Sequence, residues 1–195
     1  MSVTGDRLSR VLALIDEANA RDPTLVGADR RPAELLYGER MSAMLSRFCP
    51  DAGEHLEIAV RGQHIERWTS PRASYPQGRA GYLRWRTDLK THHARRVAEV
   101  MAAAGYAAGD IARVEALVRK ERLKYDAEAQ ALEDVACLVF LEHYAGEFIA
   151  RHDDDKVVGI LAKSAAKMSP DGLAAASRLA LPGRLGRLLQ VALAS

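Results

Sequence analysis

Residues 126–151, DAEAQALEDVACLVFLEHYAGEFIAR, decide the fold class, because they form the most apolar helical segment of the chain. Asp126 is a residue type that caps helix N-termini, and between residues 131 and 141 only Glu133 and Asp134 are charged. Apolar residues on all sides of a helix predict that it is buried among other helices. The two carboxylates would then lie in the interior, where a charge is costly unless it is paired, bound to a metal ion or used in chemistry.

Helical periodicity continues on both sides of this segment. Apolar residues at spacings of three and four predict helices over residues 5–21, 33–48, 52–68, 79–104 and 110–122, and further helices follow residue 152. No stretch alternates with a period of two for long enough to predict a strand. We therefore expect an all-α fold, a multi-helix bundle in one domain over residues 1–195, with residues 170–195 as a helical tail packed on it.

Composition narrows the possible functions. The chain has 28 Lys and Arg against 26 Asp and Glu, so no overall field favours nucleic acid or a membrane surface. No segment approaches the roughly 20 consecutive apolar residues of a transmembrane helix. Two cysteines, Cys49 and Cys137, make no disulfide framework. We expect a cytoplasmic protein with no membrane partner, and the oligomeric state stays open.

Several polar residues share helix faces with core residues. His93 lies on the face of Leu89 and Val97, whereas His92 shares a face with the charged residues Asp88 and Glu99. Only His93 is therefore expected to point inward. The alternative is a core histidine bonded to a backbone carbonyl. For Glu133 and Asp134 the alternative is a structural ion pair with Arg119, Lys120 or Arg122.

Two earlier helices carry polar residues of the same kind. The apolar stripe through Val60 continues into Gln63, with His64 on the adjacent face, and Tyr37 lies on the stripe of Met41. The residues expected to do chemistry at one internal site are His64, His93, Glu133 and Asp134. The residues expected to bind substrate are Tyr37, Gln63, Arg67, Trp68, Arg72, Tyr75, Arg79, Trp85, Arg86 and Lys120.

Residues 67–86 support this choice, because they combine arginines with aromatic residues. Arginine presents a planar fork of donors that suits phosphate or carboxylate, and Trp and Tyr offer flat faces for a base or a ring. Gly78 and Arg79 open a helix, whose free N–H groups favour an anion. The loop over residues 69–78 is long for a bundle, and such loops are often functional. The alternative is a solvated loop in which arginines cover aromatic surface.

The order of these residues resembles the HD-domain superfamily of helical metal-dependent phosphohydrolases. Tyr37 stands where that pattern has its first histidine, Gln63-His64 where it has His-Asp, and His92-His93 opens the next helix pair. Glu133-Asp134 stands where the last aspartate falls, although Ala136 is an alternative register. The resemblance implies an HD-like fold. The positions at which this chain departs from the pattern, such as Tyr37 and Gln63-His64, are those at which the superfamily has its metal ligands.

A closer resemblance covers nearly the whole chain. The strings QHIERW (63–68), RAGYLRWR (79–86) and LEDVACLVFLE (132–142) are similar to an uncharacterised, mainly bacterial family, domain-of-unknown-function family 4202. This resemblance implies no activity.

Three functions remain. The first is an enzyme acting on a phosphorylated or otherwise anionic small molecule or nucleotide. In one version, a hydrolase, His64, His93 and Asp134 or Glu133 hold a divalent metal ion that activates water; in the other, His93 or His64 is a general base oriented by a carboxylate. The second is an RNA- or nucleotide-binding module that uses residues 67–86. The third is a non-catalytic scaffold with a degenerate HD site, in which the inward polar residues form a buried network.

Overall fold

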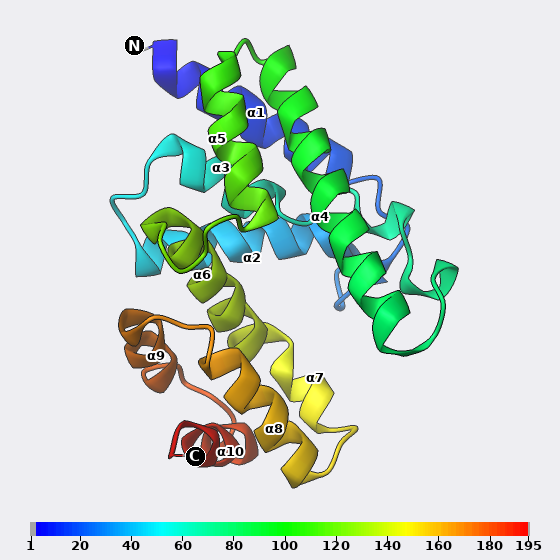
Figure 1. Cartoon of the computed structure of the whole chain (residues 1–195), viewed down its shortest axis with the longest axis vertical. Coiled ribbons are helices and arrows are strands. Elements are labelled where there is room, and N and C mark those ends of the chain that lie inside the picture. Colours follow the sequence, from blue (N-terminus) through cyan, green and yellow to red (C-terminus); the bar gives the residue numbers. More distant parts are fainter. Residues whose placement is uncertain (1–2, 195) are drawn as a thin grey trace.

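The computed structural model describes the backbone of residues 3–194 and the side chains of residues 6–193, and it is almost entirely helical (Figure 1). The predicted all-α class is confirmed. The helices are α1 (Val3–Asn19), α2 (Ala33–Phe48), α3 (Glu54–Gly62), α4 (Gly78–Ala103), α5 (Ala108–Arg119), α6 (Ala127–His143), α7 (Ala145–Ile149), α8 (Asp154–Ala165), α9 (Pro170–Ser177) and α10 (Gly183–Ala194).

Apolar side chains form two clusters. One joins α1, α3, α4 and α5 through residues such as Val11, Ile58 and Val97, and the other joins α2, α6, α8 and α10. Figure 1 shows α2 and α6 across the middle of the molecule, with α1, α4 and α5 toward one end and α8, α9 and α10 toward the other. Helix α3 contributes to both clusters, with Ile58 in one and Val60 in the other.

The third helix is shorter than its periodicity predicts. It ends at Gly62, and the chain turns through Glu66, whose φ of 53° is left-handed, before a short 3₁₀ helix η1 (Arg67–Thr69). Two tertiary contacts explain the turn. A Cβ at Gly62 would lie 2.5 Å from Val97 Cγ2, so only glycine allows α3 to approach α4 this closely, and the Glu66 N–H donates to the Asn19 side chain at 3.0 Å.

Two other predicted boundaries differ. Helix α6 ends at His143 rather than reaching Arg151, because Tyr144 leaves the helical region before α7 resumes. Helix α5 covers Ala108–Arg119 rather than residues 110–122, and the carboxylate of Asp110, in its first turn, contacts His55 Nε2 at 2.9 Å.

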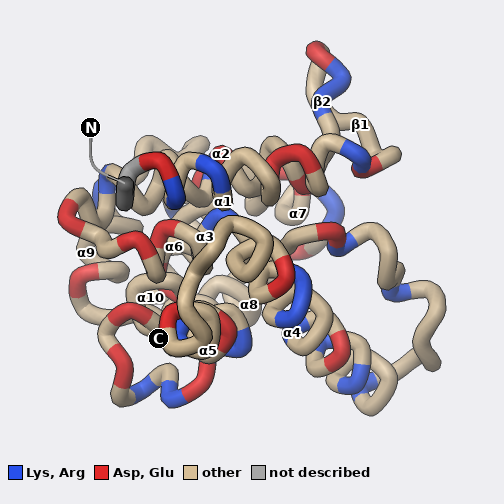
Figure 2. The backbone as a smooth tube through the Cα atoms, turned by 90° about the horizontal axis from the view of Figure 1, so that it is seen from above, with Lys and Arg blue, Asp and Glu red and all other residues tan. Residues whose placement is uncertain are grey.

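The strands among the described residues are β1 (Leu25–Val26) and β2 (Arg31–Pro32), which pair antiparallel as a hairpin. Two residues are too few to show an alternating pattern, so the sequence did not predict them. Figure 2 shows the hairpin projecting from the bundle, and β2 leads directly into α2.

The loop before α4 is folded onto that helix. It contains η1 and a second 3₁₀ helix, η2 (Arg72–Ser74). The indole N–H of Trp85 donates to the Ser70 carbonyl at 2.9 Å. A Cβ at Gly81 would lie 1.9 Å from the Pro76 carbonyl oxygen, so a glycine is required where the loop crosses the helix. The loop is therefore an ordered wall beside the start of α4.

Candidate functional site

A cavity of 430 Å³, here named the main chamber, opens between α2, the turn after α3, α6 and the end of α8. A smaller cavity of 90 Å³, the side chamber, lies against α4. The two share Gln63, His64, Arg67, Arg86 and Lys120, and together they are named the basic pocket. The main chamber is also lined by Ala33, Glu34, Tyr37, Glu133, Ala136, Cys137, Phe140, Tyr144, Ser164 and Lys167, and the side chamber by Leu89, Lys90, His93 and Val118.

His93 lines the side chamber and is 4% exposed, so the prediction that it points inward is confirmed. Its Nδ1 lies 2.8 Å from the Ile65 carbonyl oxygen. Since a carbonyl only accepts, Nδ1 carries the hydrogen and Nε2 presents a lone pair. Among the described residues Nε2 has no hydrogen-bond partner, although it is buried. Burial, and then His64, lower the pKa of His93 to about 3, so the ring is neutral.

His64 lies between the two chambers. Its ring stacks on Tyr37 with centroids 4.2 Å apart, and it lies 5.8 Å from the ring of His93. An Arg67 N–H points at Nε2 from 3.0 Å, and Glu34 Oε2 lies 3.4 Å from Nδ1. Arginine only donates, so Nε2 is the acceptor and the Nδ1 hydrogen faces Glu34. Burial, followed by the charges of Arg67, Lys120 and Arg86, lowers the pKa of His64 well below its ordinary value.

Glu34 is an acidic residue of the main chamber whose pKa is shifted. It lies in the first turn of α2, and its backbone N–H donates to the buried Asp22 carboxylate at 3.0 Å. Burial raises the pKa of Glu34 to about 7, while Arg67 opposes the rise and Asp22 adds to it. This carboxyl group can therefore both give and accept a proton near neutral pH.

Cations outnumber anions in the walls. Among the described residues that line the basic pocket, the basic side chains are Arg67, Arg86, Lys90, Lys120 and Lys167, and the acidic ones are Glu34 and Glu133. Lys120 forms an ion pair with Glu133, and Lys167 lies 3.8 Å from the same carboxylate. The predicted alternative of an ion pair at Glu133 is thus confirmed. Burial, then the charges of Lys120 and Arg86, lower the pKa of Lys90, while Glu133 opposes the shift.

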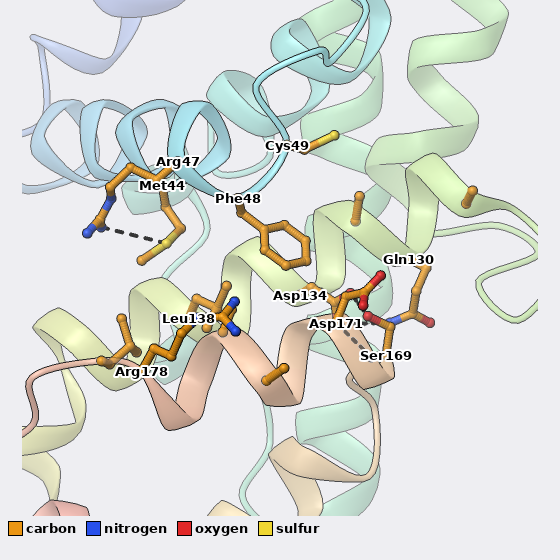
Figure 3. Close-up of a pocket in the computed structure, with 15 residues that line it drawn as sticks. Met44, Arg47, Phe48, Cys49, Gln130, Asp134, Leu138, Ser169, Asp171 and Arg178 are labelled. Carbon is orange, nitrogen blue, oxygen red and sulfur yellow. Dashed lines mark hydrogen bonds between the residues drawn. The ribbon is translucent and has the colours of Figure 1, made fainter.

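Asp134 does not join this group, and the expectation that His64, His93 and Asp134 share one cavity is wrong. Its carboxylate accepts from the Ser169 N–H at 2.9 Å, the Ser169 hydroxyl at 2.6 Å and the Gln130 amide at 3.1 Å. It lines a different cavity of 730 Å³ between α2, α6 and α9 (Figure 3). A Cβ at Gly172 would lie 2.6 Å from Asp134 Oδ1. Asp134 therefore holds the start of α9.

One of the expected metal-ion ligands, Asp134, lies apart from His64 and His93. Asp134 is engaged by Ser169 on the other side of α6, away from the chambers that His64 and His93 line. Within residues 3–194, no group of three or more His, Cys, Asp or Glu side chains is arranged to hold a metal ion. Asp134 is therefore not placed to be the third ligand, whereas Glu133, the alternative carboxylate, lines the main chamber with His64 and is paired with Lys120. The proposed chemistry uses the side chains of the chain itself.

The other predicted residues divide into two sets. Tyr37, Gln63, Arg67, Arg86 and Lys120 line the basic pocket. In the described part of the chain, the lining of these two chambers does not include Trp68, Arg72, Tyr75, Arg79 or Trp85.

Members of the second set order the loop before α4. Arg72 donates to the Tyr75 carbonyl at 3.0 Å, and the hydroxyls of Tyr75 and Ser70 lie 3.2 Å apart. The Arg67 guanidinium lies 5.2 Å from the centre of the Trp85 ring. His92, expected in solvent, is half-buried, with Nε2 4.0 Å from Glu66.

Sequence reasoning missed Glu34, Lys90, Tyr144 and Lys167. Lys90 could have been found, because it lies three residues before His93 and so on the same helix face. Glu34, Tyr144 and Lys167 reach the pocket only through the packing of α2, α6 and α8, and no local pattern marks them.

The family model for a domain of unknown function, DUF4202, matches residues 9–189, and the chain belongs to this family. Neither the curated proteins nor the solved structures contain a significant match. Within the described residues, every helix is too short or too polar to cross a lipid bilayer.

Proposed function

We propose that the basic pocket is the active site of an enzyme that acts on a phosphorylated small molecule or nucleotide, with His93 as general base. The observation that carries the proposal is the buried Nε2 of His93, which lacks a partner among the described residues and lies in a chamber walled by cations. Buried polar atoms are nearly always hydrogen-bonded, so an exception calls for an explanation. Among the described residues the exceptions are Arg7 Nε, His92 Nε2 and His93 Nε2, and of these three residues only His93 lines the basic pocket. A substrate or water that binds there would satisfy it.

The predicted alternative, a core histidine bonded to a backbone carbonyl, accounts for only one of the two ring nitrogens of His93. The Ile65 carbonyl fixes the ring and its tautomer. A scaffold needs nothing more from His93, and it would gain stability by satisfying the second nitrogen as well. The free lone pair therefore favours chemistry over a purely structural network.

The charges of the walls define the substrate. Arg67, Arg86 and Lys90 line the pocket and form no close ion pair among the described residues, although Glu34 lies near enough to feel the charge of Arg67, and Glu133 acts on Lys90. Bringing cations together in a buried site costs free energy, and a bound phosphate dianion recovers it. The same dianion would raise the pKa of His93 and His64, because it offsets both the burial and the surrounding positive charge.

Hydrolysis of a phosphate ester is the reaction that these groups serve. His93 Nε2 takes a proton from the attacking water, whose oxygen forms the new bond to phosphorus. The bond from phosphorus to the leaving oxygen breaks, and Glu34, protonated on account of its pKa of about 7, gives its proton to that oxygen. The cations stabilise the charge on the equatorial phosphate oxygens.

The test uses His93→Asn, because an asparagine amide can still donate toward the Ile65 carbonyl while the Nε2 base is removed. Phosphate release would be measured over a panel of phosphate monoesters and nucleotides, with His92→Asn as the matched control. We expect His93→Asn to lose about 10²- to 10⁴-fold in turnover, as general bases do, with inorganic phosphate still bound. Equal turnover in the two variants, or a wild-type protein that binds no phosphate, would overturn the proposal.

A further inference from the structure

One face of α4 carries a continuous basic and aromatic stripe. Arg79, Tyr82, Arg86, Lys90 and His93 follow one another at spacings of three or four residues, so they share a single face of the helix. At 1.5 Å per residue the stripe is about 21 Å long. These five residues form the α4 stripe.

The stripe runs from solvent into the basic pocket. Tyr82 is 42% exposed, Lys90 is half-buried and His93 is 4% exposed. Figure 1 shows the first turns of α4 at the edge of the molecule, beside the loop of residues 67–77. Arg86 belongs to both regions, because it lines the two chambers and also donates to the Tyr82 hydroxyl at 3.3 Å.

The segment that surrounds the start of the stripe carries positive charge and no negative charge. Residues 67–87 contain Arg67, Arg72, Arg79, Arg84 and Arg86 and no acidic residue, and basic positions recur along α4 in Figure 2. The first acid after them, Asp88, lies 3.9 Å from Arg84. Arg84 is five residues from Arg79 and therefore off the stripe.

We infer that the substrate is the end of a single-stranded nucleic acid, whose terminal phosphate reaches the side chamber while the adjoining nucleotides lie along Arg86, Tyr82 and Arg79. This inference rests on the proposed function and narrows its substrate. A lone nucleotide would have no use for a cation about 21 Å from the histidine. Single strands are bound by basic tracks with aromatic side chains on which bases stack, and the α4 stripe has both.

The shape of the pocket limits what part of the strand enters. The side chamber of 90 Å³ suits a phosphate group, and the main chamber of 430 Å³ offers Tyr37, Phe140 and Tyr144 to a base. Because Arg86, Tyr82 and Arg79 are exposed whereas Lys90 is half-buried and His93 is buried, the remainder of the strand leaves toward Arg79.

The test compares a single nucleotide with RNA and DNA pentamers that carry a phosphate at the 5′ end, at the 3′ end or at neither. Binding to the whole chain is followed by fluorescence anisotropy, with the mononucleotide as competitor. We expect a phosphorylated pentamer to bind at least about tenfold more tightly than the mononucleotide, since stacking of each base adds roughly that much. The comparison of ends and sugars identifies which strand end is held.

Two substitutions locate the strand. Arg79→Ala should weaken pentamer binding about five- to tenfold and leave mononucleotide binding unchanged, and Tyr82→Ala should weaken pentamer binding by a similar factor. Arg84→Ala is the matched control, because it removes the same charge from the same end of α4 but from another face.

The outcomes separate this inference from the proposed function. If the pentamer and mononucleotide bind equally while His93→Asn still abolishes turnover, the inference fails and the proposed function stands. If Arg84→Ala weakens pentamer binding as much as Arg79→Ala, the attraction is general and the stripe is refuted. Vesicles of anionic lipid that displace the pentamer would equally refute it. If neither ligand nor inorganic phosphate binds, both proposals fail.

Discussion

Replacing Asp134 by alanine should cost stability and leave ligand binding intact. The carboxylate accepts three hydrogen bonds, two from Ser169 and one from Gln130, and it is 1% exposed. A hydrogen bond to a charged group contributes about 1.5–3 kcal/mol. Asp134 lines a cavity, so water can replace part of what is lost. We therefore expect the free energy of unfolding to fall by about 3 kcal/mol, or the melting temperature by about 6–12 °C for a chain of this size.

Urea unfolding measures the loss of stability, and phosphate titration of the folded variant measures whether ligand binding is intact. Asp171→Ala is the control, since Asp171 lines the same cavity but is exposed. It should change stability by less than about 0.5 kcal/mol. The reasoning is refuted if Asp134→Ala costs less than about 1 kcal/mol, or if the folded variant loses phosphate binding.

Two further predictions concern the basic pocket. Since burial raises the pKa of Glu34 to about 7 from 4.5, the folded protein keeps a proton that the unfolded chain has lost, and this destabilises the fold increasingly as pH rises between these values. Glu34→Gln should therefore gain stability relative to wild type as the pH rises from about 4.5 to 7, measured by urea unfolding; a difference that stays constant with pH would contradict the assignment. Inorganic phosphate should raise the melting temperature, with a stabilisation of about 2.7 kcal/mol at a hundredfold excess over its Kd that grows further with the logarithm of the phosphate concentration. Arg86→Ala should abolish this shift and Arg84→Ala should keep it, whereas an equal rise in all three proteins would mean a general salt effect.

The buried face of a helix could be predicted from sequence where residues three and four positions apart are all apolar. His93 shares its face with Leu89 and Val97, and its burial follows from that spacing alone. The partnership of Lys120 with Glu133 was one of three foreseen for that acid, and the structure selects it. His92 was less predictable. Its charged neighbours indicate solvent, but the turn after α3 brings Glu66 against it.

Residues outside regular helices were harder to place. Glu34 belongs to the site because the hairpin and Asp22 fix the start of α2 beside His64. Periodicity predicts a helix through residues 63–68, whereas Gly62 against Val97 and Glu66 against Asn19 turn the chain there. These contacts join residues far apart in sequence, so a local pattern cannot contain them.

The adjacent carboxylates of α6 show where the sequence stops and the tertiary structure begins. The apolar run of residues 131–141 determines by itself that the helix is buried and that both acids must find partners. Successive residues of a helix point about 100° apart, so the two acids must also face different neighbours. Which neighbours these are depends on the placement of other helices. The end of α5 gives Glu133 its lysine at the basic pocket, and the start of α9 gives Asp134 its serine at the other cavity. The sequence thus determined that two buried acids exist, and only the packing of α5 and α9 decided which one faces the histidines.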